Sequence, residues 1–143
     1  MSRLDELIKE YCPDGIRFAL LKDVTTKIVD GMHNLPKGLS STGKYPVISA
    51  QNISNDSIDM SSDKYADEDV FRQENGRTRV ETGDILLTIV GAIGRSAIVS
   101  TQRMLFQRSV CVITPNQNLI LSGFLKYVFD SDPIQERMIR NAH

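Results

Sequence analysis

The chain has 143 residues, a formal net charge of −1 and an apolar fraction of 41%, which together predict one folded domain with its own core. No apolar run reaches the roughly 18 residues that a membrane-spanning helix needs. The charged N-terminus lacks the apolar stretch of a signal peptide. We therefore expect no membrane segment and a cytoplasmic location. Cys12 and Cys111 form no Cys-x-x-Cys pair, so we expect both to be reduced and buried.

Charge is unevenly distributed along the chain. Residues 31–70 carry 3 basic and 6 acidic side chains, whereas residues 71–110 carry 6 basic and 3 acidic ones. All six basic residues of the second stretch are arginine, whose planar guanidinium suits phosphate and guanine edges better than a lysine ammonium does. Composition alone favours an ordinary solvated surface, and the slight net negative charge counts mildly against a nucleic-acid binder.

The N-terminal half predicts a helix, a long loop and short strands. Apolar residues at helical spacing predict a helix over residues 3–11, with Ser2 as its N-cap and Cys-Pro-Asp-Gly as its stop. Residues 20–29 fit a short helix or a strand. Residues 30–46 predict a long loop, which in a compact domain is usually functional or disordered. Strands are expected at 47–50 and 57–60, followed by a short helix within 63–76.

The C-terminal half predicts a hairpin, a long strand and two helices. The apolar run 85–90 predicts a strand covered on both faces, and residues 104–115 predict one long strand. A helix is expected over 119–129, and another begins at Asp132 as N-cap with Pro133 in the first helical position. The expected fold is a single α+β domain, with a mixed, mostly antiparallel central sheet and helices at both ends of the chain.

The stretch Gly91-Ala92-Ile93-Gly94-Arg95 allows three interpretations. A phosphate-binding P-loop ends in Lys-Ser or Lys-Thr at a helix start, and a dinucleotide fingerprint needs three glycines that open a helix. Here two glycines are followed by β-branched residues, which are typical of a strand. We therefore favour a hairpin whose glycines permit positive φ, with Arg95 at the solvent edge of the turn.

The sequence predicts no catalytic residue, no metal and no cofactor. His33 and His143 are the only histidines, and a zinc site would need more Cys and His ligands. Asp132-Pro133 matches part of the Asn/Asp-Pro-Pro-aromatic motif of amino-methyltransferases, but it lacks the second proline and the aromatic residue. A helix start explains this pair. The acids at 67–69 are direct neighbours and cannot all face one ion.

Polar side chains beside turns and strand ends are the remaining candidates for a binding site. Asn and Gln amides can pair with adenine, arginine can pair with guanine, and basic side chains can contact phosphates. Turn capping or ordinary surface polarity explains any one of these residues taken alone. The candidate DNA-binding residues are Asn34, Lys37, Gln51, Asn52, Arg72, Arg77, Arg95, Gln107 and Arg108.

Three segments together resemble the target-recognition domain of the specificity subunit of type I restriction–modification systems. Residues 4–24, LDELIKEYCPDGIRFALLKDV, resemble the leader of such subunits. Residues 45–54, YPVISAQNIS, resemble the strand that follows the first variable loop. TGDILLTIVGAIGRSAIV together with FQRSVCVITP resembles the most recognisable part of the family, in which Gly-Asp-Ile-Leu leads to Gly-x-Ile-Gly and a Gln-x-Ser-Val strand.

The resemblance implies a non-catalytic module that reads one half of a bipartite double-stranded DNA target. Its partners would be a methyltransferase subunit, which uses S-adenosylmethionine, and a restriction subunit, which cleaves DNA. Family members carry two recognition domains joined by long spacer helices. This chain has one and ends about where the first spacer helix would begin, so we expect an artificial or natural fragment. The alternatives are a protein-interaction module without DNA binding, or a fragment of a nuclease or methyltransferase.

Overall fold

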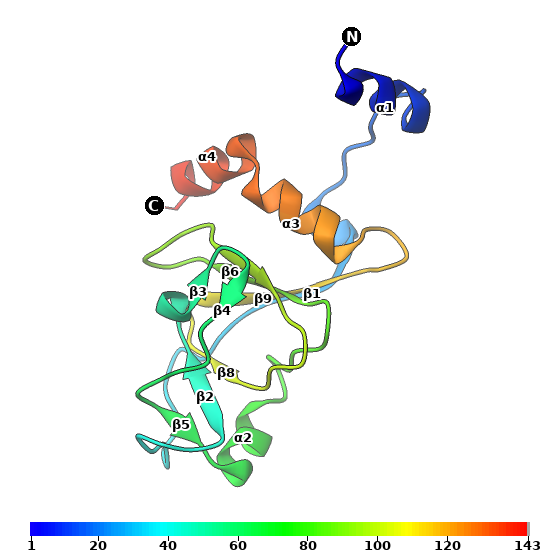
Figure 1. Ribbon diagram of the computed structural model, residues 1–143. Coiled ribbons are helices and arrows are strands. Elements are labelled where there is room, and N and C mark those ends of the chain that lie inside the picture. Colours follow the sequence, from blue (N-terminus) through cyan, green and yellow to red (C-terminus); the bar gives the residue numbers. More distant parts are fainter. Residues whose placement is uncertain (143) are drawn as a thin grey trace.

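Runs of short strands and segregated α-helices form an α+β arrangement (Figure 1). The computed structural model describes residues 1–142, so His143 lies outside it. The helices are α1 (Arg3–Tyr11), α2 (Glu68–Glu74), α3 (Ser122–Asp130) and α4 (Asp132–Arg140), with two 3-10 turns, η1 (Leu21–Asp23) and η2 (Ala50–Asn52). The strands are β1 (Thr25–Asp30), β2 (Tyr45–Ile48), β3 (Ile53–Ser54), β4 (Ser57–Ile58), β5 (Tyr65–Ala66), β6 (Ile85–Thr88), β7 (Ser96–Ile98), β8 (Leu105–Phe106) and β9 (Val110–Pro115). Helix α1 precedes the strands, α2 lies between β5 and β6, and α3 and α4 follow β9.

The largest sheet has four strands in the order β1-β9-β6-β7, and all its neighbours are antiparallel. A second sheet places β2 between β5, which is antiparallel to it, and β8, which is parallel to it. Strands β3 and β4 form a small antiparallel pair. The expected α+β fold, with mixed and mostly antiparallel strands and helices towards both ends of the chain, is confirmed, although the strands form three sheets where one central sheet was expected.

Strands β6 and β9 are buried on both faces, which explains why their sequences are apolar apart from Thr88 and Thr114. Successive strand residues point to opposite faces. Leu86 and Val112 therefore belong to one core cluster, which also contains Phe106. The alternate residues of the same strands pack in another cluster with Leu125 and Phe129 of α3. Residues 85–88 are buried as predicted, but residues 89–90 leave the core and are exposed.

Helix α1 differs from α3 because it buries none of its residues. It stands clear of the sheets, on an extended segment that leads to β1 (Figure 1). Its start is well defined: the Ser2 hydroxyl accepts a hydrogen bond from the Asp5 amide at 3.2 Å, and the Asp5 carboxylate accepts one from the Ser2 amide at 2.9 Å. The predicted cap is confirmed, while the apolar side chains of α1 face solvent.

Two predicted elements are corrected by contacts between distant segments. The expected single strand over 104–115 breaks into β8 and β9, because residues 107–109 form a turn in which the Val110 amide donates to the Gln107 carbonyl at 3.0 Å. The expected helix within 63–76 shortens to α2, because Tyr65–Ala66 pairs with β2 instead.

The start of α4 is also corrected. Ser131 is the N-cap residue and Asp132 is already helical, although the Ser131 hydroxyl makes no capping bond and donates to the Val128 carbonyl at 2.6 Å. Pro133 still lies in the first turn, where its missing amide hydrogen costs nothing.

The remaining boundaries shift by a few residues. Residues 20–29 hold both η1 and β1, and the long loop predicted at 30–46 continues until β2 begins at Tyr45. The strand expected at 47–50 lies at β2, the one at 57–60 is limited to β4, and the helix expected at 119–129 is α3. None of the helices in residues 1–142 has the length and apolar character to cross a bilayer.

Candidate functional site

The turn at residues 107–109 joins three segments that are distant in sequence. The Arg108 amide donates to the Met32 carbonyl at 3.0 Å, and the Gln107 amide donates to the Ile48 carbonyl at 2.9 Å. The Ser109 carbonyl accepts from the Ile89 amide at 2.9 Å. The turn therefore holds together the chain beyond β1, the chain beyond β2 and the hairpin that follows β6.

A fourth contact and a glycine tighten this junction. The Ser109 hydroxyl accepts a hydrogen bond from the Ala50 amide at 2.9 Å. A side chain at Gly31 would place its Cβ 2.2 Å from the Gln107 carbonyl oxygen, so only glycine permits the observed approach of the two backbones. Because the contacts that join the segments are mostly between backbone atoms, most side chains of the junction are left available for other partners.

We name these four segments, residues 31–34, 49–52, 89–95 and 107–109, the rim. They lie at the end of the four-stranded sheet where β1 and β6 finish and where β7 and β9 begin. The rim contains two arginines, one histidine and no acidic residue. Although the whole chain has a net charge of −1, the four rim segments themselves carry basic residues and no carboxylate.

Five of the candidate residues lie on the rim with side chains that are open to a ligand. They make no side-chain hydrogen bond or ion pair to any of residues 1–142, and each is exposed or half-buried. These residues are Asn34, Gln51, Arg95, Gln107 and Arg108. The structure therefore brings four separate segments that carry open amide and guanidinium groups together at one end of the sheet.

Asn52 lies on the rim but its side chain is used internally. Its amide nitrogen donates to the carbonyls of Asp59 and Ser61, at 2.9 and 2.6 Å. Its amide oxygen accepts from the Ser49 amide at 3.1 Å, as part of a capping box for η2. The Asn52 amide therefore stabilises the local fold and is not free to bind DNA, which the sequence alone did not indicate.

Arg77 lies next to the rim and is also engaged. Its guanidinium donates to the Asp30 carboxylate at 3.1 Å and to the Gly31 carbonyl at 3.1 Å. His33 Nε2 lies 2.6 Å from the other carboxylate oxygen of Asp30. The hydrogen bonds from His33 and Arg77 hold the pKa of Asp30 below its ordinary value. Asp30 is thus a neutralised neighbour of the rim and not an open negative charge.

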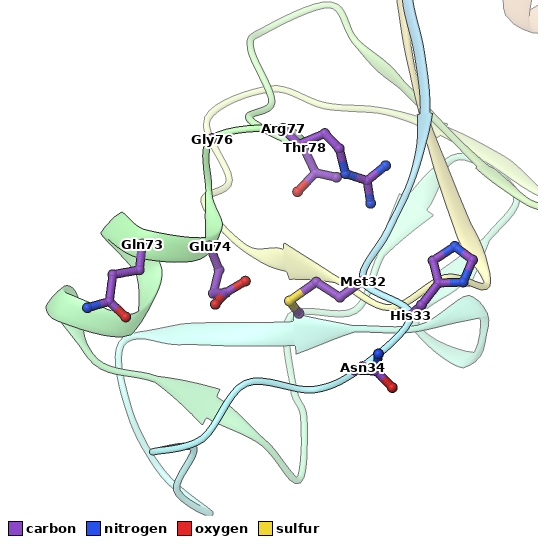
Figure 2. A pocket seen from close by; sticks show the side chains of 8 residues that line it. All are labelled: Met32, His33, Asn34, Gln73, Glu74, Gly76, Arg77 and Thr78. Carbon is purple, nitrogen blue, oxygen red and sulfur yellow. The ribbon is translucent and has the colours of Figure 1, made fainter.

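An open cleft of about 390 Å³ lies beside this ion pair (Figure 2). Arg77 and Thr78 line it on one side and Asn34 on another, while α2 contributes Gln73 and Glu74. The lining mixes charges of both signs and has no buried cationic centre. We therefore treat the cleft as a border of the rim.

Two further candidates lie outside the rim. Arg72 is on α2, and its guanidinium is 3.7 Å from the Glu68 carboxylate. Lys37 is exposed in the loop before β2. Its neighbour Gly38 approaches Val70 of α2, where a Cβ on the glycine would be 3.3 Å from the valine side chain. Both residues therefore belong to the surface around α2.

The hairpin interpretation of residues 91–95 is confirmed. Strands β6 and β7 pair as antiparallel neighbours. Gly91 and Gly94 have φ of +79° and +91°, a region that residues with a Cβ rarely occupy. Arg95 begins the returning chain, where its amide donates to the Thr88 hydroxyl at 2.9 Å and its carbonyl accepts from the Thr88 amide.

No group of three His, Cys, Asp or Glu side chains within residues 1–142 is placed to hold a metal ion. Both cysteines are free thiols, as expected, and Cys111 is buried. The expectation that Cys12 is also buried is wrong, because Cys12 is half-buried. Burial raises the pKa of Cys111 to about 11, so its thiol is neutral at physiological pH and is a weak nucleophile.

Sequence reasoning missed the residues that support the rim from beneath. Gln135 of α4 and Lys126 of α3 contact the backbone or side chains next to Arg95, although they are 31 or more positions away in sequence. An isolated lysine or glutamine within a helix gives no signal of such a contact. A lysine in the apolar stretch of α3 is the one hint that the sequence offered.

No known protein-family model matches this chain, and no curated protein is significantly similar to it.

Proposed function

We propose that the chain is a sequence-specific double-stranded DNA recognition module, of the kind found in type I specificity subunits, and that the rim is its DNA-contacting surface. The observation that carries the proposal is the convergence at the 107–109 turn. It gathers open Asn, Gln and Arg side chains on segments that carry no acidic residue. These are the groups that pair with adenine, guanine and phosphate. The nearby carboxylates of Asp30, Asp56 and Asp130 are paired with Arg77, His33 or Lys126.

The distribution of exposed apolar groups supports the same conclusion. Ile89 and Val90 are exposed at 37% and 47%, beside the open arginines of the rim. Apolar side chains next to polar ones suit the major groove, where the thymine methyl group lies beside hydrogen-bonding base edges. The module would read one half of a split target and take no catalytic part, and separate methyltransferase and restriction subunits would perform the chemistry in the cytoplasm.

A second candidate function is protein interaction, which the exposed apolar side chains of the helices favour. Phe18 is 97% exposed between α1 and β1, and Tyr127 of α3 is 77% exposed. Neither residue belongs to the rim segments, so a protein partner could bind through side chains other than those proposed to contact DNA. If the rim bound a protein and not DNA, then its affinity for DNA duplexes would not show the steep salt dependence that a polyanion produces.

The test is a titration of labelled duplexes at several salt concentrations, after selection of bound sequences from random DNA. We expect the chain alone to bind with an affinity on the order of micromolar or weaker at physiological salt, and a complete complex to bind much more tightly. Each arginine that contacts a phosphate contributes about 0.9 to the slope of log affinity against log salt.

Arg95→Ala and Arg108→Ala should each weaken binding, and each variant that removes a phosphate contact should reduce the salt slope by about 1. Arg103→Ala is the matched control, because Arg103 is another exposed arginine of the same stretch that lies outside the rim. Equal losses for all three variants would mean that only bulk charge matters. Tight binding that is insensitive to salt would contradict a DNA-binding rim.

A further inference from the structure

The residues on either side of Arg95 are held by the C-terminal helices. On one side, Gln135 Nε2 of α4 donates to the Gly94 carbonyl at 2.8 Å and to the Phe129 carbonyl at 2.6 Å. A Cβ on Gly94 would lie 2.5 Å from Gln135 Oε1, so the glutamine amide is pressed against the turn. Gln135 therefore fixes the turn immediately before Arg95.

On the other side of Arg95, Lys126 of α3 holds the first residue of β7. Its ammonium group lies 3.3 Å from the Ser96 hydroxyl, and the side chain is only 9% exposed. The same nitrogen forms ion pairs with Asp56 at 2.8 Å and with Asp130 at 2.7 Å. Ser96 also donates to Asp130 at 3.2 Å, so the network is closed.

The charges of this network explain why a buried lysine is tolerated. Burial alone would lower the pKa of Lys126, but hydrogen bonds and ion pairs with Asp130 and Asp56 outweigh it and leave the pKa raised. Lys126 is therefore a fixed positive charge. Its removal would leave two carboxylates close to each other without their common partner.

Those two carboxylates share a cleft with Arg95. The cleft has a volume of about 340 Å³, and its lining includes Asp56, Asp130, Arg95 and Gln135. A guanidinium beside two uncompensated carboxylates would pair with them, since a planar fork suits a carboxylate. In the folded chain Lys126 forms ion pairs with both carboxylates, and Arg95 makes no side-chain ion pair with any of residues 1–142.

We propose that Gln135 and Lys126 are positioning residues for Arg95: Gln135 holds the turn that presents it, and Lys126 neutralises the acids that would otherwise capture it. The inference rests on the proposed role of the rim in DNA binding. It joins the C-terminal helices to the binding surface, although neither helix contributes a residue to the rim.

The first arm of the test needs no DNA. Gln135→Met keeps the size of the side chain and removes both hydrogen bonds. We expect faster hydrogen exchange at the Gly94 and Arg95 amides, whose partners are the Thr88 carbonyl and hydroxyl. Gln117→Met is the matched control, because Gln117 donates to Ser122 at the opposite end of the sheet. Unchanged exchange at Gly94 and Arg95 in Gln135→Met would overturn the role of Gln135.

The second arm measures duplex affinity. Gln135→Met and Lys126→Met should each weaken binding by about three- to tenfold, the cost of ordering or freeing one side chain. Both effects should disappear in an Arg95→Ala background, whereas a general loss of stability would persist there. Lys126→Arg should retain affinity, and Asp56→Asn should restore part of what Lys126→Met loses. Thermal unfolding of each variant identifies any that fail to fold.

The two arms separate this inference from the proposed function. If the parent chain binds no duplex, then the proposed function fails, and with it the role of Lys126. The exchange arm still decides whether Gln135 holds the turn. If the parent binds but the losses add to that of Arg95→Ala, then DNA recognition stands and the positioning roles are wrong.

Discussion

The two ends of the four-stranded sheet differ in whether their polar side chains form hydrogen bonds within the chain. At the end opposite the rim, the Ser122 hydroxyl donates to the Gly83 carbonyl and accepts from Gln117, both at 2.6 Å. Asp84 is buried and accepts from the Glu81 amide at 3.0 Å. At the rim, both guanidiniums and every side-chain amide except that of Asn52 stay open. The two ends therefore differ in the engagement of their polar side chains as well as in residue type.

The difference indicates which end is built for stability and which for binding. Polar groups that bond to each other at a strand end stabilise the fold and have little left to offer a ligand. Polar groups held on a firm backbone without partners add little to stability. Such groups are the expected signature of a recognition surface. Three substitution experiments would break or sharpen this contrast.

The largest effect is expected at the glycines that close the turns at each end of β6. Gly94→Val should destabilise the fold by more than about 2 kcal/mol, because it combines positive φ with displacement of the Gln135 amide from its two hydrogen bonds. Gly83→Val and Gly91→Val, also at positive φ, should cost about 1–2 kcal/mol. Urea unfolding measures these changes. Gly76→Val is the control, since nothing lies near its Cβ position. Parent-like stability for Gly94→Val would mean that the turn adopts another conformation.

A smaller effect should separate engaged from open side chains. Ser122→Ala and Asn52→Ala should each cost about 1–2 kcal/mol, because each removes a partly buried hydrogen bond, to the Gly83 carbonyl and from the Ser49 amide respectively. Gln51→Ala and Gln107→Ala should change stability by no more than about 0.5 kcal/mol. The neighbouring residues 51 and 52 make a matched pair for the same unfolding measurement. If Gln51→Ala cost as much as Asn52→Ala, then the rim would be a structural element and not an open surface.

The smallest effect concerns acid and the Asp30 ion pair. The pKa of Asp30 in the folded chain is lowered by His33 and Arg77. Its contribution to stability is therefore complete above its unfolded pKa of about 3.9, and is lost as pH falls through the lower folded value. The pair is partly exposed, so the contribution should be about 0.5 kcal/mol or less. Unfolding at several values below pH 4 should show a shallower acid decline in Asp30→Asn. If Asp30→Asn lost stability in acid as steeply as the parent chain, then other carboxylates would be responsible for the acid-induced loss of stability.

Local patterns predicted the helices and the hairpin but not the contacts between distant segments. Apolar spacing and a Ser N-cap located α1, and two glycines before β-branched residues located the turn between β6 and β7. The break in 104–115 was missed because Gln-Arg-Ser contains neither glycine nor proline. Its turn is set by partners that are far away in sequence, at Met32 and Ile48.

The candidate site could be predicted as a set of residue types, but not as a surface. Open and engaged amides look identical in sequence, as Gln51 and Asn52 show. The parallel pairing of β2 with β8 joins residues 47–48 to 105–106, and no periodicity within either strand encodes it. The supporting roles of Gln135 and Lys126 depend on the packing of two helices beneath a hairpin. Such information exists only in the folded chain.

The backbone bonds of the 107–109 turn have a consequence for how this protein can change over time. Three of the junction's bonds join main-chain amides to main-chain carbonyls, at Met32, Ile48 and Ile89. Such bonds form whatever side chain a position carries, except where a Cβ has no room, as at Gly31. The rim can therefore exchange its open side chains while its framework persists. New binding preferences could arise by single substitutions, and an engineer could vary these positions in a library without first redesigning the fold.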